Sequence, residues 1–175
     1  FLYTTLFRSM QLLRRSVTLA TSTLFALQLG AANWPAWRGP NGDGSSPEKN
    51  VPLSWSATEN LRWKIALPEP GDSSPVVWGD KVFLAQAFER EGGRTVTCYD
   101  RRDGKLLWSQ GVPFTKEKKH NLNSFATNTP TVDAQRVYAV WQSREAAQVV
   151  AYDHDGKLSW TGELPPYKSG HGGGI

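Results

Sequence analysis

The residues with the clearest capacity for chemistry lie in one polar stretch, residues 112–128. His120 is the side chain there that can gain or lose a proton near neutral pH, so it could act as a general base. No nucleophile or carboxylate partner can be assigned to it from the sequence. The alternative is that the polar side chains of this stretch cap turns and satisfy loop backbone groups. The candidate site residues are His120, Asn121, Asn123 and Asn128.

The chain contains a single cysteine, Cys98, so no intrachain disulfide can form. No histidine or second cysteine stands at metal-ligand spacing around it. A second copy of the surrounding sequence has Ala151 at the same place, which indicates a small buried side chain rather than a reactive thiol. We therefore expect no catalytic residue and no metal ligand at this position.

Two copies of a strand–turn–strand pattern lie on either side of residues 112–128 and must therefore position the candidate site residues. Residues 95–108 and 148–160 each pass from a β-branched, apolar strand through a polar turn into a second strand that reaches a Trp. The Asp-Gly pair in each turn supplies the positive φ that a hairpin needs. The preceding stretches, 74–83 and 129–138, repeat as well, with Pro near a strand start and a basic residue before an apolar pair.

Each unit is therefore expected to contain four short antiparallel strands. The expected strands are 74–78, 81–87, 94–99 and 105–109, followed by 129–133, 136–142, 147–152 and 157–161. The tryptophans that close successive units, Trp63, Trp108 and Trp160, are 45 and 52 residues apart. A four-stranded unit at this period indicates a β-propeller blade. We predict an all-β fold with two such blades, at about 74–109 and 129–161.

The turn sequences resemble the repeats of the pyrroloquinoline-quinone-type (PQQ-like) propeller family, which closes each blade with Ala-x-Asp-x-x-Thr-Gly-x-x-x-Trp. The matching residues are Cys98, Asp100, Gly104 and Trp108 in the first copy, and Ala151, Asp153, Gly156 and Trp160 in the second. The first copy has Cys for Ala and Asp for Thr, and the second has a turn one residue shorter. The resemblance covers residues 34–175. It implies that the Trp docks between neighbouring blades, with its hydrogen-bond acceptor in the next blade, and says nothing direct about catalysis.

The N-terminal residues differ in character from the rest. Residues 1–9 precede the only Met, Met10, and resemble the translation of a sequencing adapter, so we expect them to be a non-native leader outside the fold. Residues 10–32 resemble a secretory signal peptide, in which Arg14–Arg15 precede a moderately apolar run that ends at small residues before Asn33. This run is too short for a membrane span, which needs roughly 20 apolar residues. The sequence predicts export to the bacterial periplasm or beyond, by the general or the twin-arginine route.

The rest of the chain divides into a lead-in segment, 33–60, and propeller repeats, 61–175. Residues 60–65 are expected to form an outer strand that helps to close a ring, and the tail at 167–175 stands where a third blade should begin. Two blades leave unpaired edges and cannot close a ring of four to eight. We therefore expect an N-terminal fragment that requires further blades of its own parent chain.

The net charge of the chain limits the classes of binding partner that the sequence favours. Three of the 20 basic residues precede residue 33, which leaves 17 basic and 16 acidic residues and a net charge of +1. Nothing in that balance favours nucleic acid or an anionic membrane as a partner, and no membrane span is expected in the mature chain. The family resemblance implies an exported binding or scaffold module for an unknown protein or small molecule, with no cofactor. The alternative is a quinoprotein dehydrogenase that oxidises an alcohol or sugar with PQQ and calcium.

Overall fold

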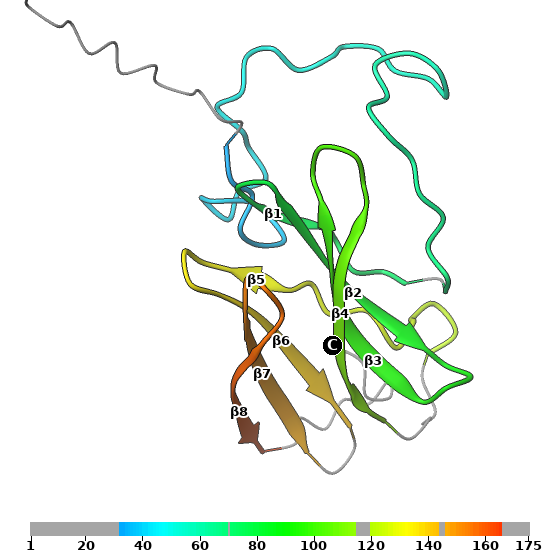
Figure 1. Cartoon of the computed structure of the whole chain (residues 1–175), viewed down its shortest axis with the longest axis vertical. Coiled ribbons are helices and arrows are strands. Elements are labelled where there is room, and N and C mark those ends of the chain that lie inside the picture. The colour runs from blue at the N-terminus through cyan, green and yellow to red at the C-terminus, as the bar shows by residue number, and fades with distance from the viewer. Residues whose placement is uncertain (1–31, 70, 115–119, 144–145, 166–175) are drawn as a thin grey trace, which may run out of the picture.

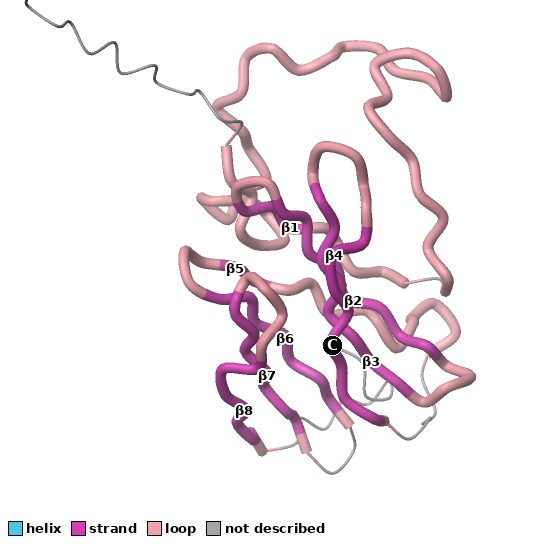
Figure 2. Tube along the Cα trace, viewed as in Figure 1, coloured by secondary structure: helices cyan, strands magenta, loops and turns pink. Residues whose placement is uncertain are grey.

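The computed structural model describes residues 32–69, 71–114, 120–143 and 146–165, and in these residues it contains strands and loops only (Figure 2). Eight strands form two separate four-stranded sheets (Figure 1). We call them blade 1 and blade 2. Blade 1 comprises β1 (Val76–Trp78), β2 (Lys81–Phe88), β3 (Gly93–Asp100) and β4 (Leu106–Pro113). Blade 2 comprises β5 (Thr131–Val132), β6 (Arg136–Gln142), β7 (Ala147–Asp153) and β8 (Leu158–Leu164).

Both blades are antiparallel meanders in which each strand pairs with the next along the chain. They also share an irregularity, because the register shifts between Cys98 and Tyr99 in blade 1 and between Ala151 and Tyr152 in blade 2. A bulge at the same place in both copies gives each outer strand the same twist relative to its neighbour. The all-β, two-blade prediction is confirmed, and all eight expected strands are present. Only β6 has the expected bounds, because β2, β3, β4, β7 and β8 extend further and β1 and β5 are shorter.

The predicted strand at residues 60–65 is not present. This segment runs past blade 1 without a strand partner among the described residues, and a strand needs a neighbour to pair its backbone groups. The lead-in also carries two exposed tryptophans. Trp37 is 64% exposed and Trp55 is 75% exposed, so both indoles lie largely in solvent.

The start of the lead-in is attached to both blades. Trp34 exchanges two backbone hydrogen bonds with Val77 of β1, at 2.9 and 2.8 Å. The carbonyl of Pro35 accepts from the backbone N–H of Val132 in β5. The innermost strands of the two blades are therefore connected through two adjacent lead-in residues, whereas the lead-in that follows loops away from the sheets (Figure 1). The predicted leader, signal peptide and third-blade tail lie outside the described residues, apart from Ala32 at the end of the signal.

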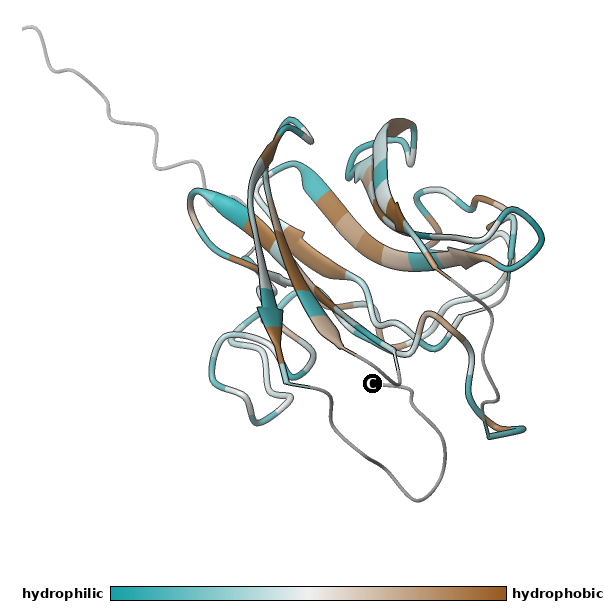
Figure 3. Cartoon of the chain, turned by 90° about the horizontal axis from the view of Figure 1, so that it is seen from below, coloured by the Kyte–Doolittle hydropathy of each residue, from teal (hydrophilic) through white to brown (hydrophobic). Residues whose placement is uncertain are grey.

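The main core lies between the two blades. Alternation along β2 and β6 turns one set of apolar side chains of each sheet towards the other blade. Figure 3 shows apolar residues along the strands of both sheets. The buried cluster comprises Val76, Phe83, Ala85, Val96 and Cys98 from blade 1 and Val132, Val137, Ala139, Trp141, Val150 and Tyr152 from blade 2. Because each blade supplies one side of this core, neither face would be covered without the other.

Replacing Phe83 by Ala should test this shared core. The Phe83 side chain is fully buried, and its ring lies 5.9 Å from the ring of Trp108 and 5.8 Å from that of His154, a residue of blade 2. We expect the free energy of unfolding, measured by urea denaturation, to fall by about 3–5 kcal/mol. Leu107→Ala, at a half-exposed site on β4, is the control and should cost much less. A Phe83→Ala loss no larger than that of the control would contradict a core shared by the blades.

Candidate functional site

The repeat tryptophan of blade 1 is docked on the turn of blade 2. Nε1 of Trp108 donates a hydrogen bond to the backbone carbonyl of His154, at 3.0 Å. Gly156 has a φ of +86°, and a Cβ added to it would lie 2.7 Å from the indole ring. The ring of Trp108 also lies against Phe83 of its own blade and Tyr152 of blade 2. One side chain thus joins the blades by apolar packing and by a hydrogen bond.

The same contact is made one repeat earlier. Nε1 of Trp63 donates to the backbone carbonyl of Arg101 at 2.8 Å, and a Cβ added to Gly104 would lie 2.7 Å from the Trp63 ring. Trp63 precedes blade 1 in the chain, so it takes the place that a preceding blade's tryptophan would have. Trp108 therefore docks on the turn of the following blade as predicted, with its acceptor in that turn, and Trp63 makes the same contact on blade 1.

The aspartates of the motif shape the turns that receive the tryptophans. Oδ1 of Asp100 accepts from the backbone N–H of Arg102 at 2.8 Å and from its Nε at 3.0 Å. These hydrogen bonds hold the pKa of Asp100 at about 2, well below its usual value. Asp153 accepts in the same way from the backbone N–H groups of Asp155 and Lys157. Both carboxylates therefore accept hydrogen bonds from backbone N–H groups of the turns in which they lie.

Cys98 and Ala151 occupy equivalent places beneath the tryptophans. Cys98 is opposite Trp108 in the β3–β4 register, and Ala151 is opposite Trp160 in the β7–β8 register. Both small residues are fully buried. Burial raises the pKa of the Cys98 thiol to about 12, because the thiolate would lose its hydration there. The side chain is therefore a neutral thiol at physiological pH.

The candidate residues of the inter-blade loop divide into two groups. His120, Asn121 and Asn123 lie in one turn, in which the His120 carbonyl accepts from the backbone N–H of Asn123 at 3.0 Å. Nδ1 of His120 accepts from the backbone N–H of Leu122 at 3.2 Å. Asn128 is instead attached to β6, where its Nδ2 donates to the carbonyl of Val140 at 2.6 Å. His120 therefore makes a contact within its own turn, and Asn128 binds the backbone of β6. Asn121 is exposed.

The loop that carries these residues is clamped to the entry of blade 1. The backbone N–H of Ser124 donates to Oδ2 of Asp72 at 2.8 Å, and the backbone N–H of Asp72 approaches the Ser124 hydroxyl at 3.2 Å. The Thr129 hydroxyl accepts from the backbone N–H of Ser74 at 3.0 Å. The sequence analysis missed this clamp, because an Asp and a Ser separated by 52 residues give no local signal.

A buried arginine holds the same loop to both blades. Arg94, at the start of β3, is 7% exposed, and its Nη1 donates to the carbonyl of Gln142 in blade 2 at 2.6 Å. Its guanidinium carbon lies 4.6 Å from the ring centroid of Phe114 and 5.7 Å from that of Phe125. A guanidinium in this position gains cation–π attraction as well as the hydrogen bond. The alternation of β3 does not distinguish such a buried arginine from a solvated one.

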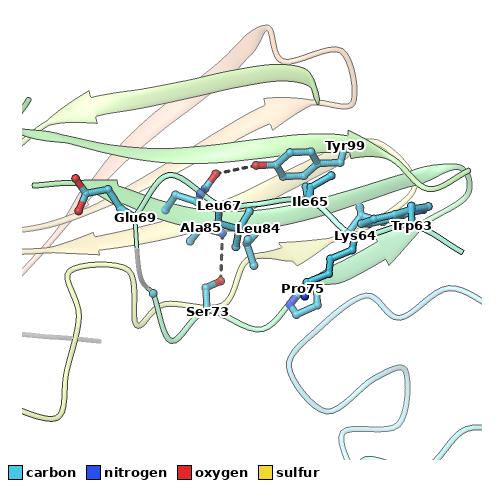
Figure 4. A pocket seen from close by; sticks show the side chains of 13 residues that line it. Trp63, Lys64, Ile65, Leu67, Glu69, Ser73, Pro75, Leu84, Ala85 and Tyr99 are labelled. Carbon is cyan, nitrogen blue, oxygen red and sulfur yellow. Dashed lines mark hydrogen bonds between the residues drawn. The ribbon is translucent and has the colours of Figure 1, made fainter. Parts of the chain in front are cut away.

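A groove of about 400 Å³ lies on the face of blade 1 that is turned away from blade 2 (Figure 4). It is bounded by residues 63–69 and 71–75 and by strands β2 and β3. Its apolar lining includes Ile65, Leu67, Pro75, Val82 and Leu84. Tyr99 donates to Oε1 of Gln86 at 3.0 Å, while Nε2 of Gln86 is buried there and has no partner. The groove was not predicted, because it exists only where residues 63–69 and 71–75 lie beside the sheet without pairing with it.

In the described ranges, no three His, Cys, Asp or Glu side chains are grouped as a metal site. The motif aspartates are engaged in their turns. None of the described residues forms a helix of the length and apolarity that a membrane crossing requires.

Two antiparallel four-stranded blades, each closed by a tryptophan on a glycine turn, define a β-propeller repeat protein. A family model described as outer membrane protein assembly factor BamB matches residues 50–170. The chain belongs to this family of PQQ-like propeller repeats. No curated protein matches the chain.

The two docking tryptophans of the blades should differ in their contribution to stability. Trp108 contacts blade 2, whereas Trp160 is 44% exposed and packs on Tyr138 of its own blade, with ring centroids 6.0 Å apart. Trp108→Ala should lower the free energy of unfolding by about 3–5 kcal/mol, and Trp160→Ala by clearly less. Chemical denaturation of both variants measures the difference. Equal losses would mean that each Trp serves only its own blade, and the docking account would fail.

The raised pKa of Cys98 predicts low reactivity and a dependence of stability on pH. The native chain should resist a thiol reagent at pH 8 and react fully in denaturant, because only the unfolded thiol ionises near its usual pKa. The folded pKa of about 12 exceeds the usual 9.0, so burial of the neutral thiol contributes stability that is present below pH 9 and is lost as pH rises towards 12. Cys98→Ala should remove that part of the alkaline loss. Rapid labelling of the native chain would contradict the buried position.

Proposed function

We propose that this chain is part of an exported bacterial β-propeller that acts as a binding or scaffold module. The motif residues support this proposal, because they are used for docking one blade on the next. Trp108 and Gly156 form the contact between the blades, and Asp153 accepts hydrogen bonds from the backbone of its own turn. In such a frame, specificity resides in the loops that it holds.

The observation that carries the proposal is the clamped loop between the blades. Asp72 fixes its middle, Asn128 fixes its end, and Arg94 packs on its aromatic residues. Immediately before the Ser124 anchor the loop presents exposed side chains, with Leu122 82% exposed close to His120. A loop that is already ordered loses less conformational entropy when it binds a partner. An exposed apolar tip flanked by polar side chains suits contact with a protein surface.

The proposal of export is supported by residues 10–32, which have the pattern of a secretory signal. The family description names an outer membrane assembly factor, which agrees with a place in the bacterial cell envelope. We propose the periplasm or the extracellular space as the location. The mass of the protein recovered from the periplasm of its native host should correspond to a chain that begins at Asn33. An unprocessed chain that remains in the cytoplasm would contradict export.

Site-specific photocrosslinking tests the binding role. A photoreactive amino acid at His120 or Leu122 of the full-length protein, expressed in its native host, should crosslink one defined partner. The same amino acid at Leu158, an exposed position on β8, is the control and should not capture that partner. Capture of the same protein with equal yield at all three positions, or at none of them, would contradict a binding role for the loop.

An activity assay separates the binding module from the dehydrogenase alternative. The full-length protein is incubated with PQQ, calcium, a panel of alcohols and sugars, and an electron-accepting dye. We expect no dye reduction above that of PQQ and calcium alone. Sustained, substrate-dependent reduction would overturn the binding-module proposal and establish the dehydrogenase.

A further inference from the structure

Four places in the chain join an asparagine or an aspartate to a following glycine. They are Asn41-Gly42, Asp43-Gly44, Asp103-Gly104 and Asp155-Gly156. Such pairs share a chemical reactivity, because the backbone nitrogen of the glycine can attack the side-chain carbonyl carbon and close a five-membered succinimide ring. Glycine favours this attack, since it has no Cβ to crowd the ring and reaches backbone conformations that other residues rarely adopt. The surroundings of each pair therefore decide which of the four reacts.

The two pairs in the blade turns are held by their surroundings. The backbone N–H of Gly104 donates to the carbonyl of Asp100 at 2.8 Å, and that of Gly156 donates to the carbonyl of Asp153 at 3.1 Å. An indole lies against each glycine, since a Cβ added to either one would meet a Trp ring at 2.7 Å. The nitrogen that would attack is engaged and the space beside it is filled. Ring closure at these two pairs therefore requires the turn to open.

The third pair is protected by the charge of its side chain. Oδ1 of Asp43 accepts from the backbone N–H and from the hydroxyl of Ser45, at 2.9 and 2.8 Å. These hydrogen bonds lower the pKa of Asp43 below its usual value, so the carboxylate is ionised at neutral pH. A carboxylate resists nucleophilic attack because it already carries negative charge. The backbone N–H of Gly44 is also engaged, by the carbonyl of Arg38 at 2.9 Å.

Asn41-Gly42 is the most open of the four pairs. Both residues are exposed in the lead-in loop near β1 (Figure 1). Nothing lies within 4 Å of the Cβ position of Gly42, which has a φ of +71°. The backbone nitrogen of Gly42 lies 3.3 Å from the carbonyl oxygen of Gly39, a longer contact than the other three glycine nitrogens make. Within the described residues the Asn41 amide makes no hydrogen bond, and it carries no charge that would repel the attacking nitrogen.

We propose that Asn41 is a site of spontaneous deamidation and isoaspartate formation in the folded protein. The Gly42 nitrogen loses its proton and bonds to Cγ of Asn41, while Nδ2 takes up a proton and leaves as ammonia. Water then opens the succinimide at either of its two carbonyl carbons and yields aspartate or isoaspartate. Either product places a new negative charge close to Asp43, and isoaspartate also lengthens the main chain between Gly39 and Gly44 by one carbon. The site is separate from the clamped loop, so its test does not depend on the proposed function.

Peptide mapping of the folded chain tests the proposal. The full 175-residue chain is incubated at pH 8, digested with trypsin at mildly acidic pH, and analysed by mass spectrometry with electron-transfer fragmentation, which distinguishes isoaspartate from aspartate. We expect the peptide of residues 39–49 to show the mass change from an amide to an acid, with both isoaspartate and aspartate at position 41. Asn41→Gln retains the amide and the glycine but would have to close a larger ring. The peptide from this variant should stay unmodified over the same period.

A matched variant separates the effect of the surroundings from that of the side chain. Asp103→Asn places the same Asn-Gly chemistry in a turn whose glycine is held by Trp63 and by the Asp100 carbonyl. In the folded chain its new amide should react at least about tenfold more slowly than Asn41, because the turn must first open. In guanidinium chloride the two amides should react at similar rates.

Three results would contradict the proposal. An Asn41 amide that stays intact in the folded chain and reacts only in guanidinium chloride would show that its turn protects it. Equal rates at the two amides in the folded chain would remove the role of the surroundings. Aspartate at position 41 without isoaspartate would exclude the succinimide route, because opening of that ring yields both.

Discussion

The arrangement of both blades depends on the approach of a tryptophan to a glycine in a tight turn. Each indole lies so close to its glycine that a single added Cβ would overlap the ring, at 2.7 Å in both junctions. The glycines also have positive φ, which other residues adopt only at a cost. The hydrogen bond to the neighbouring carbonyl then fixes the direction of the indole. The distance and register between neighbouring repeats follow from this one contact.

Two further features depend on that contact. The core between the blades closes because Trp108 brings Phe83 and Tyr152 within ring contact of it. The clamped loop sits across the same junction, where Arg94 reaches from blade 1 to the carbonyl of Gln142 in blade 2. If the blades shifted relative to each other, this loop would lose its anchors. The contact that fixes the blades therefore also orders the surface that we propose for binding.

The features that the sequence predicted are those with a local or repeated signal. The strands alternate, the turns carry Asp-Gly, and the tryptophans recur at blade spacing, so the fold could be inferred from sequence. The docking of Trp108 was implied by the resemblance to the PQQ-like repeats. Residues 60–65 look like a strand by composition, but their state depends on a partner that composition does not report. The groove and the pairing of Asp72 with Ser124 depend on contacts between distant segments. Lys81 was recognisable in the sequence as a repeated basic residue, although its contacts with His154 and Asp155 in the turn of blade 2 were not.

The central claim is that the close approach of Trp108 to Gly156 holds the blades together. The most direct measurement compares the free energies of unfolding of Gly156→Ala and Gly79→Ala, by chemical denaturation. Gly79 also has positive φ, at +55°, but nothing lies within 4 Å of its Cβ position, so it reports the backbone cost alone, roughly 1–2 kcal/mol. Gly156→Ala should cost clearly more, and this excess should disappear when Trp108 is replaced by Ala. Equal costs at the two glycines, or an excess that persists without the indole, would contradict the account.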